Sequence, residues 1–141
     1  SFWHNYYTGS IEVWICIMDS IIYIVDDDII FSEVLKRKLL IHGFTQVYTC
    51  HTGSGFLLEL NVKPDLIFLD YDLGDLTGIE VLLKIKKYSP KTEVIMVSAQ
   101  EKYKIIEEAK SLGVYRYIAK GQNQMNAEIE EALSCLAQQF N

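Results

Sequence analysis

The stretch "YIVDDDII", residues 23–30, joins a short apolar run to three consecutive aspartates. The apolar run predicts a β-strand, and Asp26, Asp27 and Asp28 follow it without a spacer. Neighbouring carboxylates repel one another, and burial beside a hydrophobic core makes their charged forms costlier still. Three of them at one strand end therefore indicate either a solvated helix start or a site that brings in positive charge.

Short apolar runs alternate with amphipathic segments from Met18 to the end of the chain. The predicted strands are residues 21–25, 45–50, 66–70, 93–98 and 115–119, and the predicted helices are residues 29–43, 53–61, 77–88, 102–113 and 127–140. The first, third and fourth strands are apolar on both faces, as expected of strands buried between two helix layers. Five such units predict an α/β fold built on a doubly wound parallel sheet.

Helical spacing assigns inward-facing side chains in three of the predicted helices. They are Phe31, Leu35 and Leu39 in the first helix, Ile79, Leu82 and Leu83 in the third, and Ile129, Leu133, Leu136 and Phe140 in the last. Gly43 and Gly113 are expected to end their helices.

The composition fits one acidic domain. A chain of 141 residues with half of them apolar can bury a sizeable core. Its 13 Lys and Arg against 19 Asp and Glu give a formal net charge of −6. This balance disfavours direct nucleic-acid binding and suits a cation or a partner with a basic face.

The cysteines give no sign of a metal site. Cys16, Cys50 and Cys135 are far apart, and no CxxC or Cys/His cluster is present in the sequence. We interpret them as reduced thiols of a cytoplasmic protein. No apolar run approaches the ~20 residues needed to span a membrane, so no membrane association is expected.

The first 17 residues differ from the rest, since they hold both tryptophans and have no helical period. We interpret residues 1–17 as a non-native leader and residues 18–141 as the domain. The alternative is an extra strand, "IEVWICI", that pairs with a sheet edge or with another copy of the chain.

The chemically informative residues lie just past the predicted strand ends. In parallel sheets these carboxyl ends meet at one edge, where ligands bind. The residues are Asp26, Asp27 and Asp28 after the first strand, Asp70 and Asp72 around the end of the third, Ser98 at the end of the fourth, and Lys120 after the fifth.

Converging carboxylates are best compensated by a hard divalent cation such as Mg²⁺, which takes one or two protein carboxylates, several waters and phosphate oxygens. Asp27 and Asp70 are the expected direct ligands. The main-chain carbonyl of Asp72 is a third candidate, and Asp26 is a candidate for holding a metal-bound water. Asp28 more simply begins the next helix, where a carboxylate is favoured.

Four stretches together resemble the receiver domain of two-component response regulators, of the chemotaxis-regulator type. They are "IIYIVDDD", "PDLIFLDYDLGDLTGIEVL", "VIMVSA" and "GVYRYIAKG", and the resemblance runs from about Ile21 to Phe140. It implies a flavodoxin-like fold with strand order 2-1-3-4-5. It also implies a Mg²⁺ site made by Asp26, Asp27, Asp70 and the Asp72 carbonyl.

The resemblance implies a role for each remaining residue. Asp70 is the phosphoacceptor, which takes a phosphoryl group from a sensor histidine kinase or phosphotransfer protein. Ser98 hydrogen-bonds a phosphoryl oxygen, and Lys120 pairs with Asp70 or with that group. Tyr117 is the aromatic switch residue. The responding surface is the helix, strand and helix at residues 102–113, 115–119 and 127–140, which is also a possible homodimer interface.

The sequence departs from the family pattern at three places. Leu73-Gly74 stands where Leu-Pro is usual, so that loop is expected to be less rigid. Lys120-Gly121 stands where Lys-Pro is usual, and because a cis bond without proline costs roughly 2.5–4 kcal/mol, we expect this bond to be trans or the loop to be reshaped. The Asp72 carboxylate occupies a variable position and is expected to affect the lifetime of the acyl phosphate.

Three other interpretations remain alternatives. A haloacid-dehalogenase-type phosphatase also uses a DxD strand end, but there the DxD comes first along the chain and an acidic pair comes late. An interaction-only receiver would be expected to lack the acidic pair, Asp70 or Lys120, all of which are present. A nucleotide-binding fold would need a Gly-rich loop after the first strand, which is missing. The sequence names neither the kinase nor an output domain, and we expect a signalling domain rather than an enzyme.

Overall fold

The structure, a computed structural model, describes residues 18–139. Within them, five parallel strands form one sheet in the order β2-β1-β3-β4-β5. The strands are β1 (Ile21–Val25), β2 (Gln46–Cys50), β3 (Leu66–Leu69), β4 (Glu93–Ser98) and β5 (Arg116–Ala119). The predicted doubly wound sheet and its strand order are therefore confirmed.

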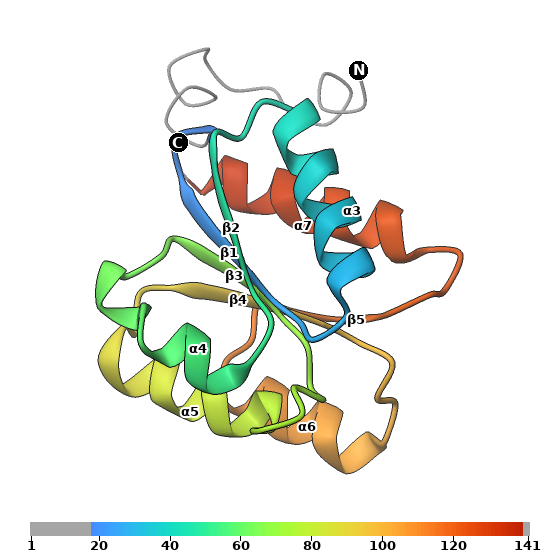
Figure 1. The fold of residues 1–141 in the computed structure, drawn as a ribbon. Helices are drawn as coiled ribbons and strands as arrows, with labels where there is room; N and C mark the ends of the chain where they lie inside the picture. The colour runs from blue at the N-terminus through green and yellow to red at the C-terminus, as the bar shows by residue number, and fades with distance from the viewer. Residues whose placement is uncertain (1–17, 140–141) are drawn as a thin grey trace.

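Helices cover both faces of this sheet, as parallel crossovers require. Those in the described residues are α3 (Ile29–Ile41), α4 (Gly53–Leu57), α5 (Gly78–Tyr88), α6 (Tyr103–Ser111) and α7 (Met125–Gln138), with a 3-10 turn η1 (Leu60–Val62) after α4. Helices α3 and α7 lie on one face, and α4, α5 and α6 lie on the other (Figure 1). The predicted leader or extra strand at residues 1–17 and the inward position of Phe140 fall outside the described residues.

Two hydrophobic clusters, one on each face of the sheet, hold the layers together. Strand β1 contributes to both, because successive side chains of a strand point to opposite faces. Ile22 and Ile24 belong to the cluster under α3 and α7, whereas Tyr23 and Val25 belong to the cluster over α4, α5 and α6. The central strands β1, β3 and β4 are buried on both faces, as predicted.

Side-chain caps fix where α3 and α5 begin, after β1 and β3. The Asp28 carboxylate accepts a hydrogen bond from the Phe31 N–H at 3.0 Å and starts α3, which confirms the helix-start interpretation of the third aspartate. Thr77 and Glu80 form a reciprocal capping box at the start of α5. Such caps each stabilise a protein by ~1 kcal/mol, and here they also set the lengths of the loops that follow β1 and β3.

Two expectations about the helices are wrong. Leu83 is 49% exposed rather than inward, because it lies two residues, or about 200° around the helix, from both Val81 and Ile85, which are fully buried. The helix expected at residues 53–61 ends at Leu57 and is followed by the 3-10 turn. Two of its five residues are glycines, which are poor helix formers.

Three smaller findings complete the fold. No peptide bond among residues 18–139 is cis, so the Lys120–Gly121 bond is trans, as expected. Cys50 and Cys135 are free thiols, and Cys50 is buried. Among the helices that the structure describes, none combines the length and the apolar character that a membrane crossing needs.

Gly78 allows the closest approach between α5 and the end of β3. Its N–H donates to the Tyr71 carbonyl at 2.6 Å. A Cβ at this position would collide with the Asp70 carbonyl oxygen and would lie 2.9 Å from Met96 Cε and from Tyr71 Cα. Because two of these neighbours are backbone atoms, the chain itself would have to move.

We therefore expect Gly78→Ala to lower the free energy of unfolding by about 2 kcal/mol, the usual cost of overpacking. Urea denaturation measures this loss. The exposed helical change Lys104→Ala is the control and should stay within about 0.5 kcal/mol of the wild type. Equal stability of the two variants would contradict the predicted collision.

Candidate functional site

The register of β1 with β3 places the first residue after each strand side by side. Val25 pairs with Leu69, so Asp26 and Asp70 come next on neighbouring strands. The Asp70 N–H donates to the Val25 carbonyl at 2.9 Å, which extends the ladder to this point. The two aspartates are thus fixed at the sheet edge by backbone pairing.

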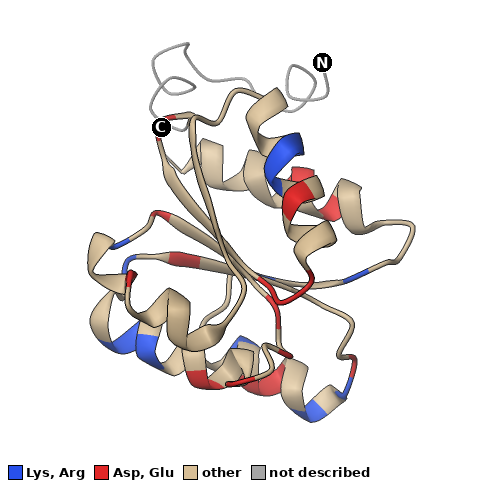
Figure 2. Ribbon diagram, in the orientation of Figure 1, with Lys and Arg blue, Asp and Glu red and all other residues tan. Residues whose placement is uncertain are grey.

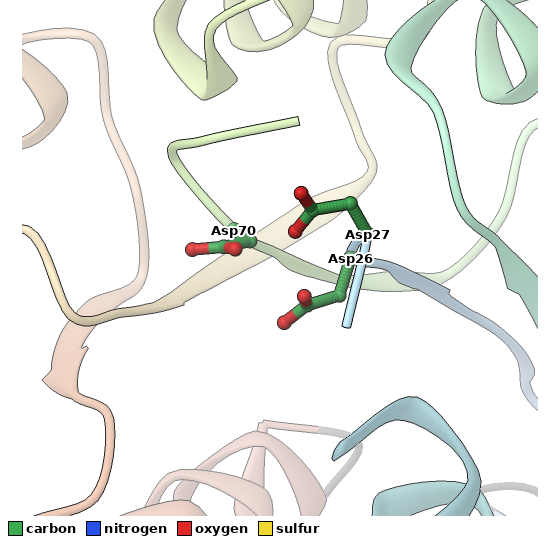
Figure 3. Close-up of side chains that lie close together, drawn as sticks. All are labelled: Asp26, Asp27 and Asp70. Atoms are coloured by element: carbon green, nitrogen blue, oxygen red, sulfur yellow. The ribbon is translucent and has the colours of Figure 1, made fainter. Parts of the chain in front are cut away.

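Asp27 completes a cluster of three carboxylates, since oxygens of Asp26, Asp27 and Asp70 all lie within 4.8 Å of one another (Figure 3). Asp26 and Asp70 are buried, whereas Asp27 is exposed. Acidic residues gather where β1 and β3 end (Figure 2). The predicted convergence of the first and third strand ends is therefore present in the structure.

Lys120 brings one positive charge to this cluster. Its Nζ lies 2.9 Å from Asp26 Oδ2 and 3.7 Å from Asp70 Oδ2. Its backbone N–H donates to the Ser98 carbonyl at 2.9 Å, which continues the pairing of β4 with β5. The sequence-based expectation named Asp70 as the partner, but the shorter contact is with Asp26.

The cluster shifts the acid–base properties of its members. Burial, and then the charge of Asp26, raise the pKa of Asp70 to about 6, while Lys120 and a hydrogen bond from Ser98 act in the opposite direction. Burial opposes the charged form of Lys120, but the hydrogen bond to Asp26 and the charges of Asp70 and Asp26 outweigh it and raise the pKa of Lys120. Lys120 is thus stabilised in its charged form, whereas the charged form of Asp70 is destabilised by its surroundings.

Ser98 and Tyr117 meet at the loop between β4 and α6. The buried Ser98 hydroxyl accepts a hydrogen bond from the Gln100 N–H at 3.1 Å. The Tyr117 hydroxyl donates to the Gln100 carbonyl at 2.6 Å, and the half-buried Tyr117 ring packs against the cluster over α4, α5 and α6. Gln100 therefore links the predicted hydroxyl residue to the predicted switch residue.

Asp72 lies in the loop after β3 and forms an isolated antiparallel bridge with Thr77. Its side chain is exposed, and it does not belong to the three-carboxylate cluster. The role given to its main-chain carbonyl stays a prediction.

Sequence reasoning missed two residues that contact the site. The Phe31 ring lies under the Lys120 ammonium, with 4.4 Å from Nζ to the ring centroid. His51 Nδ1 lies 3.0 Å from the Asp26 carbonyl oxygen. The sequence offers only weak signals for them, since Phe31 lies three residues after Asp28 and His51 directly follows the predicted strand at residues 45–50.

The donor set fits a hard divalent cation. Three carboxylates against one ammonium leave two negative charges in a partly buried site. All three acidic groups offer oxygen, the ligand type that Mg²⁺ prefers, and among the described residues no histidine or thiolate joins the group. The residues present therefore fit Mg²⁺.

The five-stranded sheet with its strand order β2-β1-β3-β4-β5 belongs to the CheY-like, flavodoxin-like class of fold. The family model of the response regulator receiver domain matches residues 22–133. The chain belongs to this family, and it is a receiver domain of two-component systems.

Curated relatives agree with this family. The transcriptional regulatory protein CitT of Halalkalibacterium halodurans is 29% identical over 103 residues, which cover 70% of this chain and 45% of that protein. Sporulation initiation phosphotransferase F of Bacillus subtilis is 28% identical over 107 residues, which cover 73% and 83%. The chain thus spans less than half of the first relative and most of the second.

Solved structures show the same fold. A CheY-like receiver domain protein from Methanospirillum hungatei has a TM-score of 0.76 at 26% identity and covers 87% of this chain and 99% of its own. The BeF3-activated DrrB receiver domain has a TM-score of 0.70 at 27% identity and covers 86% and 97%. Some receiver-containing relatives are enzymes, such as the protein-glutamate methylesterase of Desulfotalea psychrophila, of which the match covers 32%.

The raised pKa of Asp70 predicts a pH-dependent cost to stability without metal. Between the ordinary value of 3.8 and about 6, the folded chain binds more protons than the unfolded chain, so stability falls as the pH rises through this window. With a chelator present, Asp70→Asn should therefore be more stable than the wild type at pH 7, by about 3 kcal/mol.

Urea denaturation at pH 7 and pH 4 tests this expectation, and the advantage of Asp70→Asn should shrink at the lower pH. Asp19→Asn, a change of an exposed carboxylate before β1, is the control and should show no such trend. An advantage of equal size at both pH values would contradict the assigned shift.

Proposed function

We propose that this receiver domain accepts a phosphoryl group on Asp70 from a sensor histidine kinase or phosphotransfer protein, in a Mg²⁺-dependent reaction. The observation that carries the proposal is the placement of Asp70. Asp70 is a buried carboxylate 3.7 Å from the Lys120 ammonium and clustered with the carboxylates of Asp26 and Asp27. One ammonium does not balance the three carboxylates.

In the proposed reaction, an oxygen of Asp70 attacks the phosphorus of a phosphohistidine. The P–N bond breaks, its electron pair stays on the imidazole, and an acyl phosphate forms on Asp70. A pKa of about 6 leaves the carboxylate mostly ionised at neutral pH, as the attack needs. Water later attacks the acyl phosphate and returns Asp70 with release of inorganic phosphate.

Asp26, Asp27, Asp70 and the Asp72 main-chain carbonyl would hold Mg²⁺. The ion would supply positive charge beside the phosphoryl oxygens, where negative charge gathers during transfer. Lys120 serves the same purpose from the other side, because its ammonium already lies within 3.7 Å of Asp70.

Ser98 and Tyr117 are the proposed route to the surface. A phosphoryl group on Asp70 adds negative charge and acceptor oxygens next to the Ser98 hydroxyl. In the structure the Ser98 hydroxyl accepts a hydrogen bond from the Gln100 N–H. Rotation of this hydroxyl toward the phosphoryl group would break that bond. The loop at Gln100, whose carbonyl accepts from the Tyr117 hydroxyl, would then change. The surface formed by α6, β5 and α7 is the proposed responding face and a possible homodimer interface.

We propose a signalling role for this chain rather than turnover of a substrate, without direct binding of nucleic acid and in the cytoplasm. The phosphatase alternative is not favoured, because the chain belongs to the receiver family over residues 22–133. Activities of longer relatives, such as methylesterase action, belong to parts that this chain does not match.

Phosphorylation with acetyl phosphate and Mg²⁺ tests the phosphoacceptor. The wild type should gain one phosphoryl group by intact-mass measurement, and Asp70→Asn should gain none, because the amide cannot act as the nucleophile. Asp72→Asn is the control, because the Asp72 carboxylate lies two residues after Asp70 and outside the three-carboxylate cluster. This variant should still be phosphorylated.

Equal labelling of wild type and Asp70→Asn, or labelling of neither, would refute the assignment. The same samples also distinguish a receiver domain from the phosphatase alternative. Rapid multiple turnover of p-nitrophenyl phosphate would favour a phosphatase, whereas slow hydrolysis of the acyl phosphate favours the receiver.

Thermal unfolding tests the metal site. At about 100 times its dissociation constant, Mg²⁺ should raise the free energy of unfolding by about 2.7 kcal/mol. We expect Asp27→Ala to remove most of this gain. Among the ion pairs of the described residues, Lys120 pairs with Asp26 and Asp70 but not with Asp27, so the exposed Asp27 carboxylate is the one left for the metal ion.

Asp28→Ala is the matched control for this metal experiment. It removes the adjacent charge and the cap of α3, which costs ~1 kcal/mol, but it should keep the Mg²⁺ gain. If Asp27→Ala kept the full gain, the proposed ligand set would be wrong.

A further inference from the structure

Asp75 is an exposed carboxylate outside the acidic cluster, yet both of its oxygens are used. Oδ1 accepts from the Gly53 N–H at 2.9 Å and from the Leu76 N–H at 2.8 Å, and Oδ2 accepts from the Ser54 N–H at 2.9 Å. Gly53 and Ser54 begin α4, more than twenty residues earlier in the chain. One side chain thus joins the loop after β3 to the segment after β2.

These contacts favour the charged carboxylate. Hydrogen bonds from the side chain and backbone of Ser54, and then from Gly53, hold the pKa of Asp75 well below its ordinary range. Charge-assisted bonds to backbone N–H groups are stronger than neutral ones, so the charged form of Asp75 makes the stronger join.

Packing supports the same join. The side chain of Leu76 lies so close to α4 that a Cβ on Gly53 would be 3.0 Å from Leu76 Cβ and 3.0 Å from Val81 Cγ2. Leu73, at the other end of the loop tip, is 2% exposed and anchored in the core. Between the two leucines, Gly74 has a φ of +82° and open space around it, so its position contributes no side-chain anchor.

The loop transmits this anchoring to the site. Asp72 bridges to Thr77, the Leu73 N–H donates to the Leu76 carbonyl at 3.3 Å, and Tyr71 accepts from Gly78. These cross-links make residues 70–77 one compact turn, whose far end is held by Asp75. Movement of that end therefore moves Asp72 and the backbone next to Asp70.

We propose that Asp75 is a positioning residue, which ties the loop at residues 70–77 to the start of α4 and so holds the Asp72 carbonyl and Asp70 in place for Mg²⁺. This inference rests on the proposed function only in taking those two groups as metal ligands. Asp75 itself does not belong to the three-carboxylate cluster.

The test compares Asp75→Ala with Thr52→Ala, each measured with Mg²⁺ alone. Thr52 caps the same helix by accepting from the Gly55 N–H at 3.0 Å, and among the described residues this hydrogen bond of its side chain stays within α4 and does not reach the loop. We expect Asp75→Ala to weaken the affinity for Mg²⁺ by about tenfold, the lower end of what loss of an outer-shell partner costs. Amide NMR shifts during a Mg²⁺ titration measure this affinity. Thr52→Ala should bind Mg²⁺ as the wild type does.

Amide hydrogen exchange without metal gives an independent measurement. Residues 70–77 should exchange faster in Asp75→Ala than in Thr52→Ala, because only the first variant releases the loop. Asp75→Asn, which keeps one carbonyl oxygen, should lie between Asp75→Ala and the wild type in both measurements and provides a folded variant if the alanine change unfolds the chain.

Equal Mg²⁺ affinities of Asp75→Ala and Thr52→Ala would overturn the proposal, as would unchanged exchange of residues 70–77. A wild type that binds no Mg²⁺ would overturn both this proposal and the proposed metal site. A wild type that binds Mg²⁺ but takes no phosphoryl group from acetyl phosphate would refute only the proposed function, and the affinity comparison would still decide the role of Asp75.

Discussion

The pairing register of β1 with β3 is the constraint on which the site depends. It sets Asp26 beside Asp70 in a buried position where two carboxylates repel each other. A slip by one residue would relieve the repulsion, but it would also turn every side chain of a strand buried on both faces. The packing of the two hydrophobic clusters therefore holds the carboxylates together, and the site stores repulsion that a cation relieves.

Lys120 offsets part of this repulsion, and it does so more for Asp26 than for Asp70. Its ammonium lies 2.9 Å from Asp26 and 3.7 Å from Asp70, so the more buried carboxylate has the closer partner. The Phe31 ring beneath the ammonium favours the cation at this place. Asp70 is left with a raised pKa and with the longer of the two contacts with Lys120.

Sequence reasoning could predict the strand ends because they follow from periodicity and order. Asp26, Asp70, Ser98 and Lys120 each come directly at or after an apolar run, and parallel topology alone brings such positions to one edge. The Leu83 error came from a helix in which Val81, Leu82 and Leu83 are consecutive apolar residues, so the pattern alone leaves open which of them face the core.

Contacts between loops were beyond sequence reasoning for a physical reason. The link from Asp75 to Gly53, and that from Tyr117 to Gln100, join segments far apart in the chain through backbone groups, which are the same in every residue. No side-chain pattern marks a backbone N–H or carbonyl as a partner. Only the geometry of both loops together reveals such a bond.

The loop at residues 70–77 shows how the chain orders a turn without proline. A proline restricts the chain in the unfolded state as well as in the folded one. Leu73, Leu76 and Asp75 order the loop only in the folded chain, because Leu73 is buried in the core and the neighbours of Asp75 and Leu76 belong to α4. The order of the loop beside Asp70 is therefore tied to the start of α4, the helix that follows β2. One carboxylate and two backbone N–H groups of α4 make this connection.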